Sequence, residues 1–505
     1  MVMISNPLLN PTTIFKKIRK MKNLYSLKSI LLIVFYLLGL HTCFGQSKAE
    51  QIDKLLTFCY ETGQFNGSLV VAEHGKVIYK KGFGLANMEW NIPNHANTKF
   101  RLGSITKQFT AVLVMQLVEQ GKIKLDAPIV TYLPDYPLPA GEKVTIHHLL
   151  SQSSGIKDYT NLPNFRNGGI QNVFSPEGLI KLFADLPLGF EPGEKFSYSN
   201  SNYVLLGKII ERLSGKPYAQ HVQDNIFTPL KMQNSGYYNS SAIVKSRATG
   251  YEKNGEGYIN AGYVDMNVTY AAGALYSTVD DLFLWDQALY SSQLLTPKSL
   301  NLLFANQVAI NKNSYYGYGW YVGEVSNLTN AKLRIAQHSG NLPGFVTRIC
   351  RMPSEKNLIV LLDNTTNAPL KEISDAISAI LYDKPVIMPR ISFAKTIFEV
   401  MEKQGLVIGV EKIKQLKNSK AYIIQEVDMN ESAYQLLQAG KIQEALEMLK
   451  LNAETFPRSG NVYDSLGEGY LKAGNKELAI VNYKKAVEID PKNDNAKKML
   501  NELTR

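Results

Sequence analysis

The chain has 505 residues, more than one hydrophobic core usually supports, so two or three domains are expected. Its composition, 45% hydrophobic and 20% charged, is ordinary for a globular protein. The formal net charge is +11, but six of the 55 basic residues and no acidic residue lie in the first 45 positions, which leaves 49 basic against 44 acidic residues. This mild excess is spread along the chain and gives no nucleic-acid-binding signal.

Residues 1–45 have the pattern of a targeting segment. Basic residues precede an apolar run at 30–40, which is too short for a membrane span and typical of a secretory signal. Gly45 is the expected cleavage point, and Met21 would make a normal start, which would leave 1–20 as an upstream extension. We therefore expect a periplasmic or secreted protein, or a membrane-anchored one if this segment stays uncleaved.

Strand patterns lie at both ends of the following region. A hairpin is expected at 67–79, with its turn at His74-Gly75. From about 104 to 310 the chain is mainly helical, with loops rich in proline and glycine. Further strands are then expected at 317–322, 333–336, 345–349 and 358–362, and a helix at 373–381. This order predicts an α+β fold, one antiparallel sheet split by a helical insertion, with the active site where the two meet.

The last seventy residues repeat with a period of 34. The matching pairs are Gly440 and Gly474, Leu437 and Leu471, Ala445 and Ala479, and Pro457 and Pro491. This period is typical of tetratricopeptide repeats, all-α helix pairs that stack on one another. We expect them at 429–505, ending in a capping helix at 493–504, after a helical linker at 384–428 that could be a divergent repeat. A plain helical spacer is the alternative.

A serine and a lysine one helical turn apart, Ser104 and Lys107, precede a long apolar helix at 109–118. Residues i and i+3 are neighbours on a helix, so the two side chains should lie together. The Ser-x-x-Lys pattern also occurs at Ser154 and Ser392. Ser154 has no apolar helix behind it, and Ser392 lies past the expected end of the domain, so context favours Ser104.

Two distant segments complete the pattern. Tyr198-Ser199-Asn200 lies between a turn at 191–194 and a helix at 203–210, a short loop on a rigid frame. His338-Ser339-Gly340 follows much later. If these segments meet Ser104 and Lys107 in space, they form an acylating nucleophile without a Ser-His-Asp triad.

These motifs resemble those of the class C β-lactamase and penicillin-binding-protein-like serine hydrolases. The resemblance spans residues 52–383 and extends to further segments at 100–103, 149–155, 192–197 and 272–278. It implies a β-lactamase/transpeptidase-like fold, an antiparallel sheet flanked by helices. It also implies a serine hydrolase that forms an acyl-enzyme.

The resemblance assigns a role to each matching residue. Ser104 would be the nucleophile, with Lys107 and Tyr198 as its base. A lysine amine is charged at pH 7 unless it is buried, so either a neutral amine or a tyrosinate could take the proton, and the sequence leaves both open. Asn200 would orient Lys107 and contact the substrate amide. The backbone N–H groups of Ser104 and Asn341 would form the oxyanion hole.

Two positions depart from the pattern. Many β-lactamases have Lys-Thr-Gly where this chain has His338-Ser339-Gly340, and a histidine is largely neutral at pH 7. We therefore expect an ester, a D-amino-acid peptide or amide and, at low efficiency, a β-lactam as the substrate. Gln152 occupies a place where relatives often have a histidine.

The sequence also allows other functions. A slowly deacylating penicillin-binding or cell-wall-fragment sensor, whose repeats bind a protein partner, is the main alternative, and a scaffold without activity is a third. No Cys/His cluster has metal-ligand spacing, so neither metal nor cofactor is expected. Cys59 and Cys350 could pair, yet nothing in the sequence places them together.

Overall fold

A computed structural model describes residues 46–166, 169–254, 257–326, 328, 332–366 and 368–504. The expected targeting segment therefore lies outside the described residues. Within the part of the chain that is described, no helix is both long enough and apolar enough to cross a membrane.

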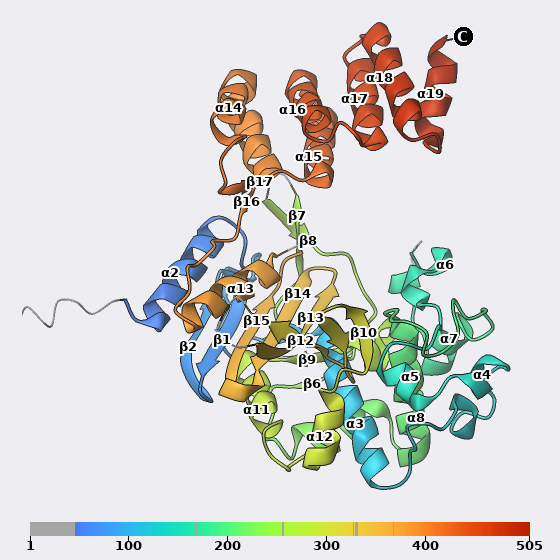
Figure 1. Cartoon of the computed structure of the whole chain (residues 1–505). Coiled ribbons are helices and arrows are strands. Elements are labelled where there is room, and N and C mark those ends of the chain that lie inside the picture. The colour runs from blue at the N-terminus through green and yellow to red at the C-terminus, as the bar shows by residue number, and fades with distance from the viewer. Residues whose placement is uncertain are drawn as a thin grey trace, which may run out of the picture. The chain divides into compact units, whose positions relative to one another are not determined.

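The centre of the region 52–383 is an eight-stranded antiparallel sheet (Figure 1), with the strand order β10-β11-β12-β13-β14-β15-β1-β2. The N-terminal hairpin, β1 (Gly67–Glu73) and β2 (Lys76–Phe83), joins the later strands because β1 pairs with β15 (Asn357–Asp363). The remaining strands are β10 (Val308–Asn311), β11 (Ser314–Tyr316), β12 (Tyr321–Val325), β13 (Leu333–Leu342) and β14 (Phe345–Met352). The predicted α+β sheet, assembled from the two ends of the region, is confirmed.

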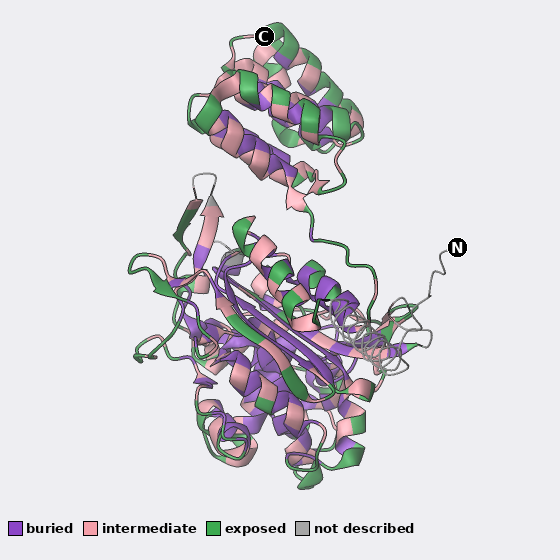
Figure 2. Ribbon diagram, turned by 90° about the vertical axis from the view of Figure 1, so that its left-hand side faces the viewer, coloured by how far each residue is buried: buried purple, intermediate pink, exposed green. Residues whose placement is uncertain are grey.

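The two faces of this sheet pack against different helices. On β1, Leu69 and Val71 lie in a core with α2 (Lys48–Glu61) and α13 (Leu370–Leu381), whereas Val70 lies in the core of the helical insertion. This alternation is the two-residue period of a strand. The strands β1, β14 and β15 are buried along almost their whole length (Figure 2). Cys59 and Cys350 lie in the same core as Leu69 and Val71. Both are buried and have free thiols, so no disulfide joins them.

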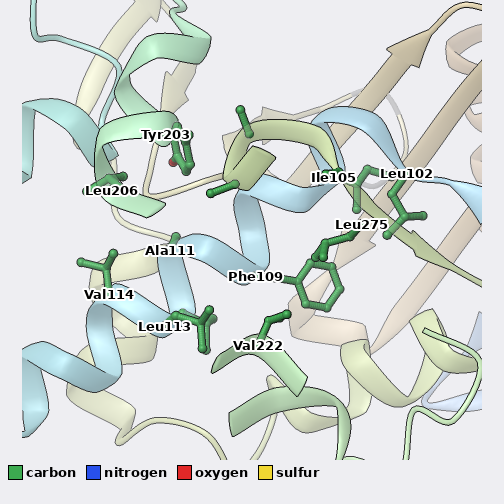
Figure 3. Packing of buried hydrophobic residues seen from close by; sticks show 14 of the residues in the cluster. Leu102, Ile105, Phe109, Ala111, Leu113, Val114, Tyr203, Leu206, Val222 and Leu275 are labelled. Carbon is green, nitrogen blue, oxygen red and sulfur yellow. The ribbon is translucent and has the colours of Figure 1, made fainter. Parts of the chain in front are cut away.

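Between β2 and β10 the chain forms the helical insertion. Its helices are α3 (Thr106–Glu119), α4 (Ala140–Lys143), α5 (Ile146–Leu150), α6 (Pro163–Arg166), α7 (Pro176–Lys181), α8 (Asn200–Ser214), α9 (Tyr218–Val222), α10 (Tyr270–Gly273), α11 (Val279–Ala288) and α12 (Pro297–Leu303). Helix α3 is apolar on nearly every side and is therefore buried. Its Phe109 lies beside Val222 and Leu275 (Figure 3) and stacks on Trp285, with ring centroids 4.1 Å apart. This packing fixes the start of α3 relative to the sheet.

One predicted strand is displaced. The sequence predicts a strand at 317–322, but β12 begins only at Tyr321. Gly319 has a φ of +78°, and a Cβ there would lie 2.8 Å from the carbonyl oxygen of Lys107. The chain thus bends closely against α3 at this point, which an extended strand with side chains would not allow. The strand predicted at 333–336 instead continues to Leu342 and carries the third motif.

The C-terminal residues form helices, apart from two short parallel strands, β16 (Ile391–Ser392) and β17 (Tyr422–Ile423). They are α14 (Phe393–Leu416), α15 (Glu426–Gln438), α16 (Ile442–Thr455), α17 (Gly460–Lys472), α18 (Lys476–Ile489) and α19 (Asp494–Thr504). Helix α14 is broken at Gly405, where φ is 79° and ψ is 179°. Helices α15 and α17 begin 34 residues apart, as do α16 and α18, which matches the sequence period. The assignment of these helix pairs to the tetratricopeptide class stays a prediction.

Candidate active site

The first motif is placed by the start of α3. Ser104 lies in a single 3₁₀ turn, Gly103–Ile105, that runs directly into the helix. Lys107 follows three residues later, and its Nζ donates a hydrogen bond to Ser104 Oγ at 3.1 Å. The other two Ser-x-x-Lys serines have structural partners instead. Ser154 donates to the side chain of Asn202, and Ser392 caps the N-terminus of α14.

Lys107 is completely buried among neutral acceptors. Besides Ser104 Oγ, its Nζ donates to Asn200 Oδ1 at 2.8 Å and to the carbonyl oxygen of Ala272 at 2.9 Å. Burial lowers the pKa of Lys107 to about 7, although the carboxylate of Asp158 acts in the opposite direction. A pKa in this range makes the neutral amine available at pH 7, with its nitrogen within hydrogen-bond distance of the serine hydroxyl.

Asn200 separates Asp158 from Lys107. Its Nδ2 donates to Asp158 Oδ2 at 3.1 Å and to Thr160 Oγ1 at 3.3 Å, so its Oδ1 is directed at Lys107. The carboxylate thus orients the amide without contacting the amine. A direct ion pair would have held the lysine in its charged form.

Tyr198 is the third member of the cluster. Its phenol lies beside Ser104, whose hydroxyl acts to lower the Tyr198 pKa, and Lys107 Nζ lies 4.8 Å from its ring centroid. Burial raises the pKa of Tyr198 well above its usual value. The neutral phenol is therefore favoured over the tyrosinate, and of the two bases that the sequence left open, the neutral amine fits this site.

Gln152 holds the loop that carries Tyr198. The Oε1 of this buried side chain accepts hydrogen bonds from the backbone N–H of Ser199 at 3.0 Å and from Asn202 Nδ2 at 2.6 Å. The main-chain carbonyl oxygen of Gln152 also accepts a hydrogen bond from the backbone N–H of Ser197. Sequence reasoning noted this position only as a departure from the family, but three hydrogen bonds converge on it, on both sides of Tyr198.

The third motif lies directly beside the serine. A Cβ on Gly340 would be 1.9 Å from the carbonyl oxygen of Leu102, so only glycine allows β13 to approach the turn this closely. A Cβ built on Gly103 would lie 3.0 Å from the backbone nitrogen of Asn341. The backbone before Ser104 and the N–H of Asn341 are therefore neighbours, as the predicted oxyanion hole requires.

His338 is buried and neutral. Its Nδ1 lies 2.7 Å from the carbonyl oxygen of Ser339, and its Nε2 lies 3.2 Å from the Tyr316 hydroxyl. A carbonyl only accepts, so Nδ1 carries the proton and Nε2 accepts. Burial, the nearby Lys107 and Arg348 lower the pKa of His338 to about 3. The positive charge that a lysine would supply here is thus missing from His338.

Arg348 supplies a positive charge that sequence reasoning missed. It stands opposite Ser339 on the neighbouring strand β14, where it donates to Ser339 Oγ at 3.1 Å and to Gln337 Oε1. Only 6% of the residue is exposed, and no acidic side chain pairs with it among the described residues. In the sequence it stands only as one of two arginines, with Arg351, in a mostly apolar strand segment.

A cavity of 440 Å³ connects these groups. Its lining consists of Ser104, Tyr198, Tyr321, Gln337, His338, Ser339, Gly340, Asn341 and Arg348. Lys107 and Asn200 lie behind Ser104 and Tyr198, out of contact with the cavity. All eight residues predicted for the site therefore lie together, although they come from three distant segments.

Replacing Gln152 by leucine should destabilise the fold and displace Tyr198. The change leaves the buried donors of Ser199 and Asn202 without an acceptor, which costs about 1–3 kcal/mol each in the free energy of unfolding. Urea unfolding of the variant measures the loss, with the wild-type chain as the reference. An unchanged unfolding midpoint would show that Gln152 does not hold the loop.

Comparisons with known proteins agree with this geometry. Residues 52–383 match the family model described as Beta-lactamase. A penicillin-binding protein of Bacillus subtilis is 32% identical over 362 residues, which cover 68% of this chain and 78% of that protein. A teichoic acid D-alanine hydrolase of Staphylococcus aureus is 30% identical over 285 residues, 56% of this chain and 68% of that protein. The crystal structure of a penicillin-binding protein from Bacillus halodurans has a TM-score of 0.58 and 28% identity, covering 65% of this chain and 98% of that one. The chain therefore belongs to the beta-lactamase family, as one of its serine hydrolases.

Proposed function

We propose that the chain cleaves an ester or amide by acylating Ser104, with the neutral amine of Lys107 as general base. The observation that carries this proposal is the buried Lys107 Nζ, 3.1 Å from Ser104 Oγ and surrounded by neutral acceptors. A serine hydroxyl is a weak nucleophile until a neighbouring base removes its proton. An amine with a pKa of about 7 is well matched to that task at neutral pH.

The step begins when Ser104 Oγ attacks the substrate carbonyl and its proton passes to Lys107. The carbonyl oxygen becomes an oxyanion, which the N–H groups of Ser104 and Asn341 stabilise, and losing one such donor typically costs about a hundredfold in rate. Tyr198, a neutral phenol beside Ser104, can pass its proton to the leaving group and take one back from the Lys107 ammonium, which restores both groups. Water then attacks the acyl-enzyme, and the same groups return the serine to its starting form.

The remaining site residues position this reaction. Asn200 fixes the direction of the Lys107 amine through its Oδ1. Gly340 lets β13 reach the nucleophile turn, and the neutral His338 lines the cavity, where its Nε2 accepts from the Tyr316 hydroxyl. Ser339 presents its hydroxyl to the cavity and to the guanidinium of Arg348.

Arg348 defines the substrate class. A buried guanidinium without an acidic partner is costly, and a bound carboxylate would compensate its charge. We therefore assign a carboxylate-bearing substrate to the cavity. The similarity to a teichoic acid D-alanine hydrolase and to penicillin-binding proteins supports an ester or amide that contains a D-amino acid. We further propose that the chain is exported, which the N-terminal pattern supports. We also propose that its C-terminal helix pairs bind a protein partner, which the 34-residue period supports.

Intact-mass spectrometry tests the nucleophile. The chain is mixed separately with a fluorophosphonate, a penicillin and a p-nitrophenyl ester. We expect a covalent adduct on the wild type and on Ser392→Ala, which removes a serine of the same sequence pattern, but none on Ser104→Ala. An adduct on Ser104→Ala would refute the assignment. A penicillin adduct that persists for hours, with no turnover of any reagent, would favour the sensor over the enzyme.

Steady-state kinetics test Arg348. Replacing it by glutamine should raise the KM for a peptide with a free C-terminal carboxylate about tenfold or more, the size of a lost charge-assisted hydrogen bond. The KM for a neutral p-nitrophenyl ester should stay nearly unchanged, and Arg348→Lys, which keeps the charge, should recover part of the loss. An equal rise for both substrates would show that Arg348 acts on the fold and not on substrate charge.

A further inference from the structure

A second polar cavity, separate from the one at Ser104, contains two arginines that share a single acceptor. Arg101 NH2 donates to the Tyr238 hydroxyl at 3.1 Å, and Arg247 NH1 donates to the same oxygen. The two guanidinium carbons lie 4.5 and 5.2 Å from the Tyr238 ring centroid. Two positive charges are therefore held against one neutral phenol.

In the described ranges neither arginine forms an ion pair, and the Nε of Arg101 is buried with no hydrogen-bond partner. Two acidic residues flank the lining in sequence: Glu252 accepts a hydrogen bond from the backbone N–H of Gly262 at 3.5 Å, and Asp265 accepts one from that of Asn267 at 2.9 Å. Lys99, which pairs with Arg247 through the backbone, adds another positive charge to the same segment. Like charges that converge without a counter-ion leave a local excess of positive potential.

The two arginines line a cavity of 200 Å³. Its other walls include Gly250, Ala261 and Phe345, and none of its lining residues belongs to the cavity at Ser104. Cavities that take drug-sized ligands measure roughly 300–1,000 Å³, so this one suits a smaller ligand. The ligand must also bear negative charge, because the cavity offers two guanidinium groups and no acidic partner for them.

We infer that this cavity binds a phosphate group, held by Arg101 and Arg247. Guanidinium forks match the oxygen geometry of a phosphate with paired hydrogen bonds, and a doubly charged anion would neutralise both arginines at once. Arg101 stands three residues before Ser104, so their Cα atoms are at most about 11 Å apart. The phosphate could therefore belong to a free ion or to a distant part of an extended substrate.

Isothermal titration calorimetry of residues 46–505 with inorganic phosphate, at low salt and pH 7.5, tests the inference. We expect one site with a Kd of about 1 mM or tighter. Arg247→Gln should weaken it about tenfold or more, the size of a lost charge-assisted hydrogen bond, and the exposed position of Arg247 makes misfolding of this variant a minor concern. Lys245→Gln removes one charge from the same segment without touching the cavity lining and should leave the Kd nearly unchanged.

Three results would overturn the inference. They are the absence of saturable heat, an equal Kd for Arg247→Gln and wild type, and acetate binding as tightly as phosphate. Glycerol phosphate and vesicles containing phosphatidic acid then separate the sources of the phosphate group. If Arg247→Gln hydrolyses the ester at the wild-type rate in the absence of phosphate, its catalytic site is intact. A change in phosphate binding then belongs to this cavity and not to a failure of the proposed catalytic site.

Discussion

The burial of Lys107 without a contacting carboxylate is the condition on which the chemistry of this protein depends. Its amine has three neutral acceptors, and Asn200 lies between it and the carboxylate of Asp158. Desolvation therefore lowers the pKa of the amine. A carboxylate in direct contact would stabilise the charged form and remove the base.

The sheet provides the second requirement, a close approach of backbone to backbone. Gly103 and Gly340 let the turn before α3 lie against β13, where side chains would collide. Because β1 pairs with β15, the two ends of the domain close the sheet around the long helical insertion. The insertion then presents Ser104, Lys107 and Tyr198 from its own helices and loops to the third motif on β13. Neither the sheet nor the insertion contains the site by itself.

Much of this arrangement could be predicted from sequence, for identifiable reasons. The helix that carries the nucleophile motif could be predicted from its continuous apolar run. The motif residues could be predicted from their resemblance to those of a known family. Gln152 and Arg348 were not assigned roles, because their functions arise from contacts across 47 and 9 residues of sequence that no local pattern encodes. The strand predicted at 317–322 began late because Gly319 bends against α3, a tertiary contact that overrides local propensity. The choice between amine and tyrosinate needed burial, which only the fold supplies.

The most direct measurement is the titration of the Lys107 side chain by NMR, with 13Cε-labelled lysine and a Lys107→Arg variant to assign its signal. We predict a midpoint near pH 7, whereas exposed lysines titrate near 10.4. Because the Asp158 carboxylate raises this pKa, Asp158→Asn should move the midpoint to lower pH. The rate of ester hydrolysis should rise through the same midpoint as the amine loses its proton. A midpoint near 10, or a rate that rises while Lys107 stays charged, would contradict its role as the base.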